Sequence, residues 1–250
     1  IETTTVPHQP VDATNDDTEN ALATAHKAFP SWRDEDPRAR ARVLTQAAAI
    51  MRAWRDVLTA VIVHENGKGW RDADAETCEA IDFCELYARE AIQLFEEQRL
   101  GEYVGEHNAL IHEGRGPCAV IAPWNFPLAI LCGMSVAALV TGNPVLMKPA
   151  EQTMGIARML FDILREAGAP ADVLHFLPGR GETVGVQLVS DPRVALIAFT
   201  GSKAVGLNII ETAGLTNEAQ TQVKKVVCEM GGKNAIIVDA SADLDEAVLG

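Results

Sequence analysis

Long apolar runs and an excess of positive charge are both missing from this sequence of 250 residues. No apolar run reaches the ~20 residues that a membrane-spanning helix needs. The longest candidate, residues 128–140, is interrupted by Gly133 and Ser135. The 35 acidic and 21 basic residues give a net charge of −14, which argues against a nucleic-acid or anionic membrane surface. We therefore expect no membrane span and no nucleic-acid partner.

Cysteine is scarce, and its spacing shows no pairing. The five cysteines are Cys78, Cys84, Cys118, Cys132 and Cys228. An odd count without a paired spacing predicts free thiols in a reducing cytoplasm rather than disulfides. No cysteine and histidine cluster has the spacing of metal ligands, so we expect no metal site.

Both ends of the chain suggest part of a longer protein. The sequence begins at Ile1 without a methionine, and Ser241 resembles a helix N-cap close to the final residue, Gly250. We therefore expect a fragment.

Residues 1–99 have the apolar spacing of helices. Asp36 followed by Pro37 predicts the start of a helix. Apolar residues then recur at intervals of three or four as far as Leu58, which predicts one long amphipathic helix, and another begins near Asp74. Residues 100–117 contain several glycines and a short alternation of apolar and polar residues, which predicts a β-hairpin.

From Cys118 onward, short apolar runs alternate with helical patterns. The expected strands are 118–122, 144–147, 173–177, 194–199, 225–229 and 235–238, and the expected helices lie near 128–140, 153–167, 182–189, 202–213 and from 242. This alternation predicts an α/β fold, a Rossmann-like parallel sheet with helices on both faces, preceded by the helical segment. Such sheets bind ligands beyond the carboxyl ends of their strands.

Two polar residues at predicted strand ends are suited to catalysis. The side-chain amide of Asn125, in the string PWNFP, can donate to a developing oxyanion; the alternative is a structural bond to nearby backbone. Glu229, in the string CEMGGKN, is a candidate general base if it is partly buried; the alternative is a carboxylate that caps a turn. Cys228 should point to the opposite side of the strand, toward the core.

Two further strand ends are suited to binding a nucleotide. Ser202 opens a helix whose free N–H groups make an anion site, and Gly201 would let a phosphate approach the backbone; the alternative is a plain capped helix. Lys148 and Glu151 could hold a ribose, and the carboxylate would repel a 2′-phosphate, which favours NAD over NADP; the alternative is a solvated ion pair. The string PGRGETVG is one residue too long for a dinucleotide fingerprint.

Four strings in this order, PWNFP, GNPVLMKPAEQT, FTGS and EMGGKN, resemble the aldehyde dehydrogenase superfamily. WRDADAE, EAIDFCELYAREA, PGRGETVG and the run from Gln220 to Val248 are similar to its L-glutamate γ-semialdehyde branch, the 1-pyrroline-5-carboxylate dehydrogenases. That branch includes the second half of bifunctional proline-utilisation proteins. The resemblance implies oxidation of the semialdehyde to glutamate with NAD, through a thioester, in proline catabolism.

The resemblance also implies a role for each matching residue. Asn125 would donate to the oxyanion and Glu229 would activate the water that releases the product. Phe126 would pack against the substrate, and Glu79 would lie near it. The implied cofactor contacts are Ile121, Trp124, Lys148, Glu151, Gly181, Gly201 and Ser202.

Finally, the resemblance implies how the chain is divided. Residues 1–99 and 118–250 would form the NAD-binding domain, and residues 100–117 the arm through which a homo-oligomer assembles. The nucleophilic cysteine would lie beyond Gly250, and the catalytic domain would be absent from this chain. Two alternatives stay open: another aliphatic aldehyde, such as succinate semialdehyde, as the substrate, or a non-catalytic nucleotide-binding fragment.

Overall fold

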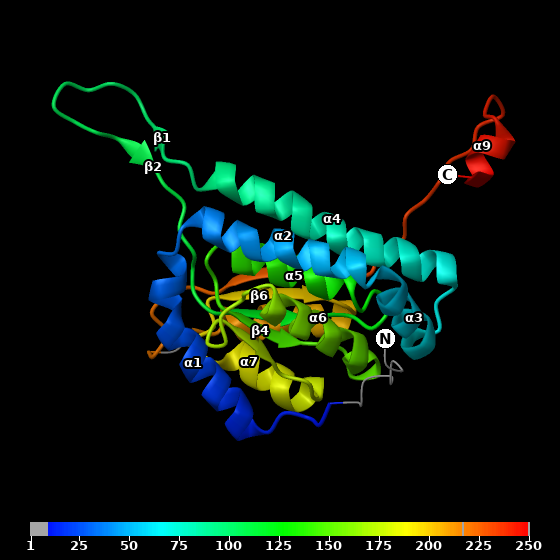
Figure 1. The fold of residues 1–250 in the computed structure, drawn as a ribbon, viewed down its shortest axis with the longest axis horizontal. Coiled ribbons are helices and arrows are strands. Elements are labelled where there is room, and N and C mark those ends of the chain that lie inside the picture. Colours follow the sequence, from blue (N-terminus) through cyan, green and yellow to red (C-terminus); the bar gives the residue numbers. More distant parts are fainter. Residues whose placement is uncertain (1–9, 217, 250) are drawn as a thin grey trace.

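A five-stranded parallel sheet forms the centre of the computed structural model, which describes residues 10–216 and 218–249. Its strands are β3 (Cys118–Ile121), β4 (Val145–Lys148), β5 (Leu174–Phe176), β6 (Leu196–Thr200) and β7 (Lys225–Glu229), in the spatial order β5-β4-β3-β6-β7 (Figure 1). In the register, Ile121 of β3 lies opposite Lys148 of β4 and Phe199 of β6. The carboxyl ends of the strands therefore meet at one edge.

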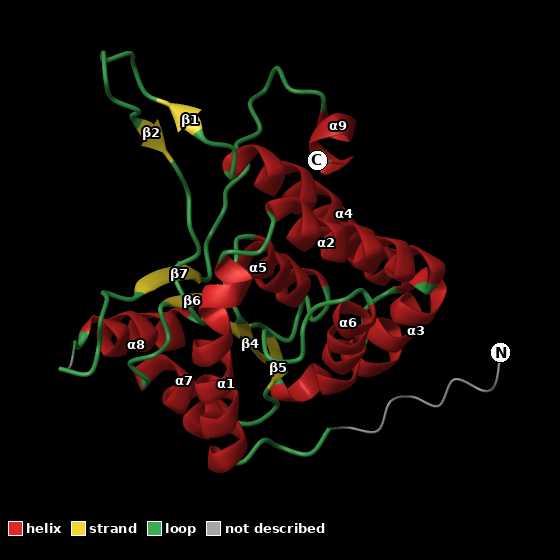
Figure 2. Ribbon diagram, turned by 60° about the vertical axis from the view of Figure 1, so that its left-hand side comes forward, coloured by secondary structure: helices red, strands yellow, loops and turns green. Residues whose placement is uncertain are grey.

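Helices cover both faces of the sheet, as the sequence predicts. One face carries α2 (Pro37–Ala53), α3 (Arg55–Asn66), α4 (Trp70–Leu94), α5 (Ala129–Val140) and α6 (Met154–Glu166), and the other carries most of α1 (Asn15–Arg33) with α7 (Val186–Ser190) and α8 (Lys203–Gly214) (Figure 2). The helices on each side enclose a hydrophobic core, the first under α2–α6 and the second under α1, α7 and α8. Val120 faces the first core, whereas Ala119 and Ile121 face the second, because successive side chains of a strand point to opposite faces.

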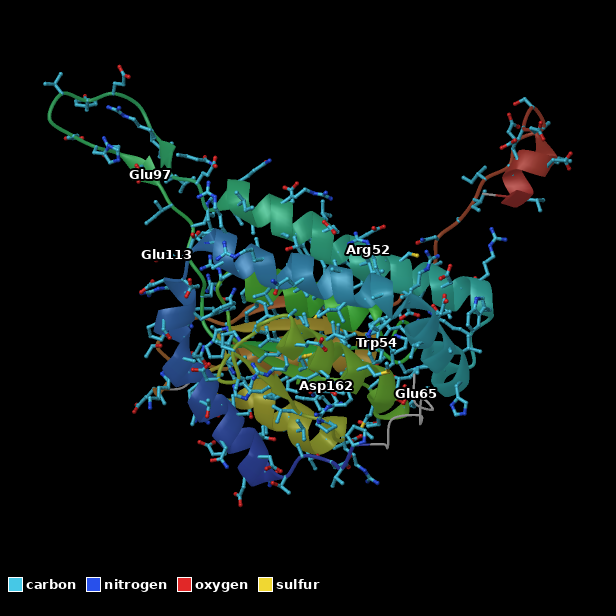
Figure 3. All side chains as sticks on the ribbon, in the orientation of Figure 1. Arg52, Trp54, Glu65, Glu97, Glu113 and Asp162 are labelled. Atoms are coloured by element: carbon cyan, nitrogen blue, oxygen red, sulfur yellow. The ribbon has the colours of Figure 1, made fainter. Side chains whose placement is uncertain are left out.

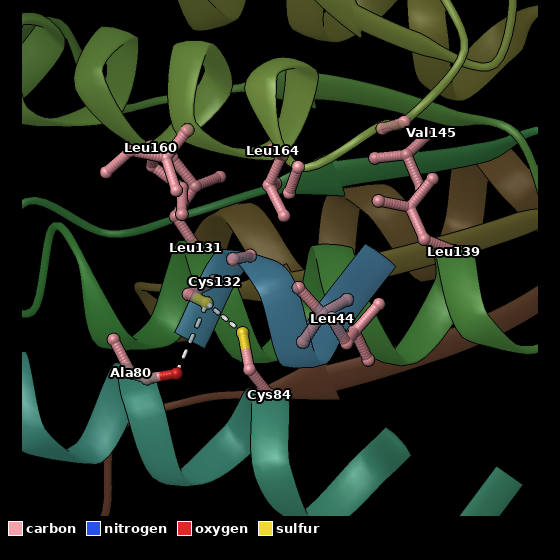
Figure 4. Close-up of a cluster of buried hydrophobic side chains, with 14 of the residues drawn as sticks. Leu44, Ala80, Cys84, Leu131, Cys132, Leu139, Val145, Leu160 and Leu164 are labelled. Carbon is pink, nitrogen blue, oxygen red and sulfur yellow. Dashed lines mark hydrogen bonds between the residues drawn. The ribbon is translucent and has the colours of Figure 1, made fainter. Parts of the chain in front are cut away.

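The first core is closed by α4 and α5, which pack closely enough to bring two thiols together. The Sγ atoms of Cys84 on α4 and Cys132 on α5 lie 3.7 Å apart, and the Cys132 thiol also donates to the carbonyl of Ala80 (Figure 4). All five cysteines are free thiols. None of the helices in the described ranges is both long and apolar enough to cross a membrane.

The single long helix predicted beyond Pro37 is wrong, because the chain breaks at Trp54 into α2 and α3. Trp54 has φ −105° and ψ 11°, and it ends one helix and precedes the next. Its exposed side chain lies at the junction (Figure 3). Met51 and Leu58, on either side of the break, are both fully buried. The apolar spacing therefore continues across the break and does not reveal it.

A strand at 235–238 is also wrong. The chain leaves the sheet after β7 and extends away from the body to α9 (Leu244–Leu249), and Ile237 is 93% exposed (Figure 1). A strand needs a hydrogen-bonded neighbour, and no described segment lies beside this one. Asp243, rather than Ser241, caps α9, since its carboxylate accepts from the N–H groups of residues 245 and 246.

The predicted hairpin is present, but its strands are short. β1 (Gln98–Arg99) pairs with β2 (Ala109–Leu110) in antiparallel register and projects from the body (Figure 1). Two short helical turns complete the described fold, a 3₁₀ turn at Glu151–Thr153 and a π turn at Gly181–Gly185.

Arg40 is a buried cation that ties α1 and α2 to α5. It is 1% exposed, and its guanidinium donates to the carbonyls of Val140 (2.8 Å), Arg33 (3.0 Å), Trp32 (3.3 Å) and Glu35. These carbonyls lie at or just beyond the C-terminal ends of α1 and α5, where a positive charge is favoured by the helix dipole. Burial lowers the pKa of Arg40, and the nearby carboxylates of Glu35 and Asp36 oppose that shift.

Replacing Arg40 by Met should lower the free energy of unfolding by about 3 kcal/mol, because buried carbonyls lose their donor. Urea unfolding followed by circular dichroism measures this. The control is Arg42→Met on the exposed side of the same helix, which should change stability by no more than ~0.5 kcal/mol. Equal effects of the two substitutions would contradict a stabilising role for the Arg40 hydrogen bonds.

Candidate functional site

A cavity of about 860 Å³ opens at the carboxyl edge of the sheet, between the ends of β3, β4, β6 and β7 and the start of α8. This volume falls in the range of small-molecule sites, about 300–1,000 Å³. The cavity brings together most of the residues that the sequence predicts: Ile121, Trp124, Asn125, Lys148, Glu151, Gly181, Gly201, Ser202 and Glu229. Phe126 and Glu79 do not line it.

Lys148 and Glu151 form one wall of the cavity. Lys148 is 4% exposed, and its Nζ donates to the carbonyl of Pro149 and lies 3.6 Å from Oε1 of Glu151. Burial lowers the pKa of Lys148, and the Glu151 carboxylate opposes that shift. The pair is therefore not a solvated surface ion pair, because its cation is buried.

Glu151 also holds the glycine loop that follows β5. Its Oε1 accepts from the backbone N–H of Gly181 at 2.9 Å. A Cβ atom at Gly181 would meet open space, and one at Gly185 would lie 3.7 Å from Cε of Lys148. The loop therefore lies against Lys148, and Gly181 is open to the cavity.

Ser202 begins α8 at the opposite wall. Its Oγ accepts from the N–H of Val205 at 3.3 Å, so it caps the helix as well as lining the cavity. Gly201 is needed for a reason that the sequence does not reveal. A Cβ atom at that position would lie 2.6 Å from Cζ of Phe199. The missing side chain makes room for the Phe199 ring.

Asn125 lies exposed at the mouth of the cavity, in the turn between β3 and α5. Its side-chain amide forms no hydrogen bond with any residue that the structure describes, which contradicts the alternative of a structural asparagine. Its neighbours are held instead. The carbonyl of Trp124 accepts from Nδ2 of Asn66 at 2.6 Å, and Nζ of Lys68 lies 3.6 Å from the centre of the Phe126 ring.

Glu229 ends β7 opposite Thr200 of β6 and lines the cavity. Its side chain is exposed, so the partial burial on which its interpretation as a general base depended is not found. β7 is an edge strand, and three of its five residues are exposed. Cys228 packs toward α8, as predicted, with its Sγ 3.9 Å from the carbonyl of Gly206.

Glu79 is exposed on α4, and the structure does not bring it to the cavity. One turn earlier on the same helix, Glu76 is buried, and its Oε1 accepts from the N–H groups of Leu128 (2.8 Å) and Ala129 (3.2 Å). Sequence reasoning missed Glu76. The available signal was an acid on the apolar face of a predicted helix, in line with Ala73 and Ala80, which are both buried.

These geometric features can be compared with known proteins. The model of the aldehyde dehydrogenase family matches residues 2–250. This chain belongs to the aldehyde dehydrogenase family.

In the described part of the chain, no group of three or more His, Cys, Asp or Glu side chains is placed to hold a metal ion.

Similar family members include 1-pyrroline-5-carboxylate dehydrogenases. The enzyme of that name from Geobacillus thermodenitrificans is 48% identical over 229 residues, which are 92% of this chain and 44% of that protein. 1-Pyrroline-5-carboxylate dehydrogenase 1 of Halalkalibacterium halodurans is 44% identical over 235 residues, 94% of this chain and 46% of that protein. The chain thus spans about half the length of the curated relatives it matches.

Similar solved structures point to the same branch. Proline utilization A from Bdellovibrio bacteriovorus, inactivated by N-propargylglycine, has a TM-score of 0.93 and 48% identity, over 96% of this chain and 25% of that one. 1-Pyrroline-5-carboxylate dehydrogenase from Thermus, with bound NAD, has a TM-score of 0.93 and 46% identity, over 96% of this chain and 47% of that one. Both likenesses confirm the predicted fold class.

Replacing Gly201 by Ala should destabilise the chain by about 1–3 kcal/mol, because the added Cβ overlaps the Phe199 ring. Gly214→Ala, at the end of α8, which begins just after Gly201, is the control. A Cβ there meets nothing within 4 Å, so stability should stay level or rise slightly. Chemical denaturation of both variants measures the difference, and a stable Gly201→Ala would contradict the packing argument.

Proposed function

We propose that the protein carrying this chain oxidises L-glutamate γ-semialdehyde, the open form of 1-pyrroline-5-carboxylate, to glutamate in proline catabolism, with NAD as the cofactor. Support comes from family membership and from relatives named 1-pyrroline-5-carboxylate dehydrogenase at 44% and 48% identity. The observation that carries the proposal is one cavity that holds the Asn125 amide, which bonds to no described residue, the Glu229 carboxylate, and the buried Lys148 beside Glu151.

The cavity fits NAD by its size and by the chemistry of its lining. Lys148 offers a donor and Glu151 an acceptor for ribose hydroxyls, and the negative charge of Glu151 disfavours a 2′-phosphate. Ser202, at the positive end of α8, would lie near the pyrophosphate. The other proposed contacts are Ile121, Trp124, Gly181 and Gly201. When bound, NAD supplies the acceptor for the hydride that leaves the substrate.

Two side chains of this chain would act on the reacting groups. The Asn125 amide would donate to the oxyanion that forms when a thiolate attacks the aldehyde carbon. Glu229 would take a proton from the water that hydrolyses the thioester. Phe126 would pack against the aliphatic part of the substrate. The proposed substrate contacts of Phe126 and Glu79 have no support from the cavity, which neither residue lines.

None of the five cysteines lines the cavity, so we place the attacking thiolate beyond residue 250 of the longer protein. Burial raises the pKa of Cys118 to about 12, and the contact with the Cys84 thiol, together with burial, raises the pKa of Cys132. Such thiols are poor nucleophiles at neutral pH. The NAD-binding domain would comprise residues 1–99 and 118–250, and the catalytic domain would lie outside this chain.

The projecting hairpin supports a homo-oligomer in the longer protein, with residues 100–117 as its arm. Tyr103, Val104 and Ile111 are exposed apolar side chains on it. Large exposed apolar groups in a projecting segment suit a contact with another chain. The unpaired spacing of the cysteines suits a cytoplasmic enzyme.

A second candidate function is a nucleotide-binding module without catalysis. The cavity contains every proposed cofactor contact within this chain, whereas no cysteine lines it. The 250-residue chain would then bind NAD and oxidise no aldehyde.

Replacing Glu151 by Gln should weaken NAD binding about tenfold and narrow the preference for NAD over NADP, since a charged acceptor for the ribose is lost. Isothermal titration of the 250-residue chain with each nucleotide measures this. Glu182→Gln is the control, because Glu182 is exposed on the π turn Gly181–Gly185 and does not line the cavity. An unchanged preference would exclude Glu151 as the ribose contact.

In the full-length protein, Glu229→Gln should slow steady-state turnover about 100-fold or more while NAD affinity is retained, because the hydrolytic water loses its base. A burst of NADH followed by slow turnover is the expected trace. Ratios of kcat/KM for glutamate γ-semialdehyde and succinate semialdehyde, measured in the unaltered protein, identify the substrate. Normal turnover of the variant would rule out Glu229 as the base.

A further inference from the structure

Helix α5 begins without a cap from its own segment. Its N-cap residue, Leu128, makes no side-chain capping bond, and Pro127 before it has no N–H group. The first N–H groups of a helix have no partner within the helix, so a buried start needs acceptors from elsewhere. This start is buried, since Pro127, Leu128 and Ala129 are all buried.

Glu76 provides the acceptor from 52 residues earlier in the chain. Its Oε1 bonds the N–H groups of Leu128 and Ala129, and its side chain is completely buried. The positive end of the helix dipole favours a carboxylate at this place. The other oxygen, Oε2, lies 2.5 Å from Nζ of Lys68, which is itself mostly buried and supplies the countercharge.

The segment that carries Lys68 also holds both neighbours of Asn125. Nζ of Lys68 lies over the Phe126 ring, a favourable position for a cation. Asn66 donates to the carbonyl of Trp124 at 2.6 Å. Between them Gly67 takes a left-handed conformation, φ 78°, which ends α3 and turns the chain. Both neighbours of Asn125 are thereby held, while its own amide bonds to no residue that the structure describes.

The same segment reaches the cofactor side of the cavity. Both carboxylate oxygens of Glu65, at the end of α3, accept from the N–H groups of Gly155 (2.7 Å) and Ile156 (2.9 Å) at the start of α6 (Figure 3). That helix directly follows the 3₁₀ turn that contains Glu151. A Cβ at Gly155 would lie 2.9 Å from Oε1 of Glu65, so the approach depends on glycine.

We propose that Glu76, together with Lys68 and Asn66, is a positioning unit that holds the Asn125 amide in place for the oxyanion. The proposal rests on the function proposed above for Asn125. Glu76 touches neither the cavity nor a substrate, and acts through the backbone of the turn between β3 and α5. A misplacement of about 1 Å at a reacting group costs on the order of 100-fold in rate, so loss of this support should be measurable.

The test uses the full-length enzyme with four variants: Glu76→Gln, Asn66→Ala, Asn125→Ala and the double variant Glu76→Gln with Asn125→Ala. Glu76→Gln keeps the shape but places an amide beside the Lys68 ammonium. It should lower kcat about 10- to 100-fold with little change in the KM for NAD, because the cofactor wall is intact. Glu90→Gln, on the exposed side of α4, is the matched control and should leave kcat unchanged.

Coupling between the two sites is the decisive readout. If Glu76 acts only through Asn125, Glu76→Gln should lower kcat no further once Asn125 is Ala. Independent, multiplying losses would overturn the proposal and leave Glu76 a purely structural cap.

Two outcomes separate this proposal from the proposed function. If Asn125→Ala keeps full activity, the role of Asn125 fails; if it loses activity and Glu76→Gln does not, only the positioning role fails. Thermal melts check folding. If Glu76→Gln does not fold, Asn66→Ala takes its place, because it removes a single bond to the Trp124 carbonyl. Asn66→Ala should likewise lower kcat no further once Asn125 is Ala. A further, independent loss of kcat would overturn the proposal.

Discussion

The position of β3 is the constraint on which the rest of the structure depends. It is hydrogen-bonded to parallel neighbours on both sides, and all four of its residues are buried. Parallel neighbours cannot be joined by a tight turn, so each connection must cross a face of the sheet. The crossovers through α5 and α6 therefore start from the same edge of the sheet. The Asn125 turn, Lys148 and Glu151 lie at these starting points, around one cavity.

Protection from solvent decreases across the sheet from β3 to β7. Lys148, on the strand next to β3, is buried, and burial lowers its pKa. Glu229, on the edge strand β7, is exposed. A buried ammonium needs a fixed partner, and Glu151 and the Pro149 carbonyl supply it. In the described residues, the cavity wall that contains Lys148 is thus better shielded from solvent than the end of β7, where the proposed base lies.

The sequence predicts those features that depend on local order and fails where a distant partner decides. Strand–helix alternation predicts the sheet, and because parallel strand ends meet, it also predicts that Asn125, Lys148 and Glu229 share a site. The cap of α5 by Glu76 depends on a contact across 52 residues, which periodicity does not contain. The strand predicted at residues 235–238 fails for a related reason: the apolar run has the composition of a strand, but no segment that the structure describes pairs with it.

An oxyanion donor has to satisfy two opposing demands. Its amide must be free of protein partners, yet it must not move when charge develops, because preorganised donors need no rearrangement during the reaction. Hydrogen bonds to the amide itself would meet the second demand and fail the first. In the role proposed for Asn125, the turn would meet both demands by fixing the flanking backbone, through two prolines and through the contacts of Asn66, Lys68 and Glu76. A rigid backbone would then hold the amide in place although it bonds to no residue that the structure describes.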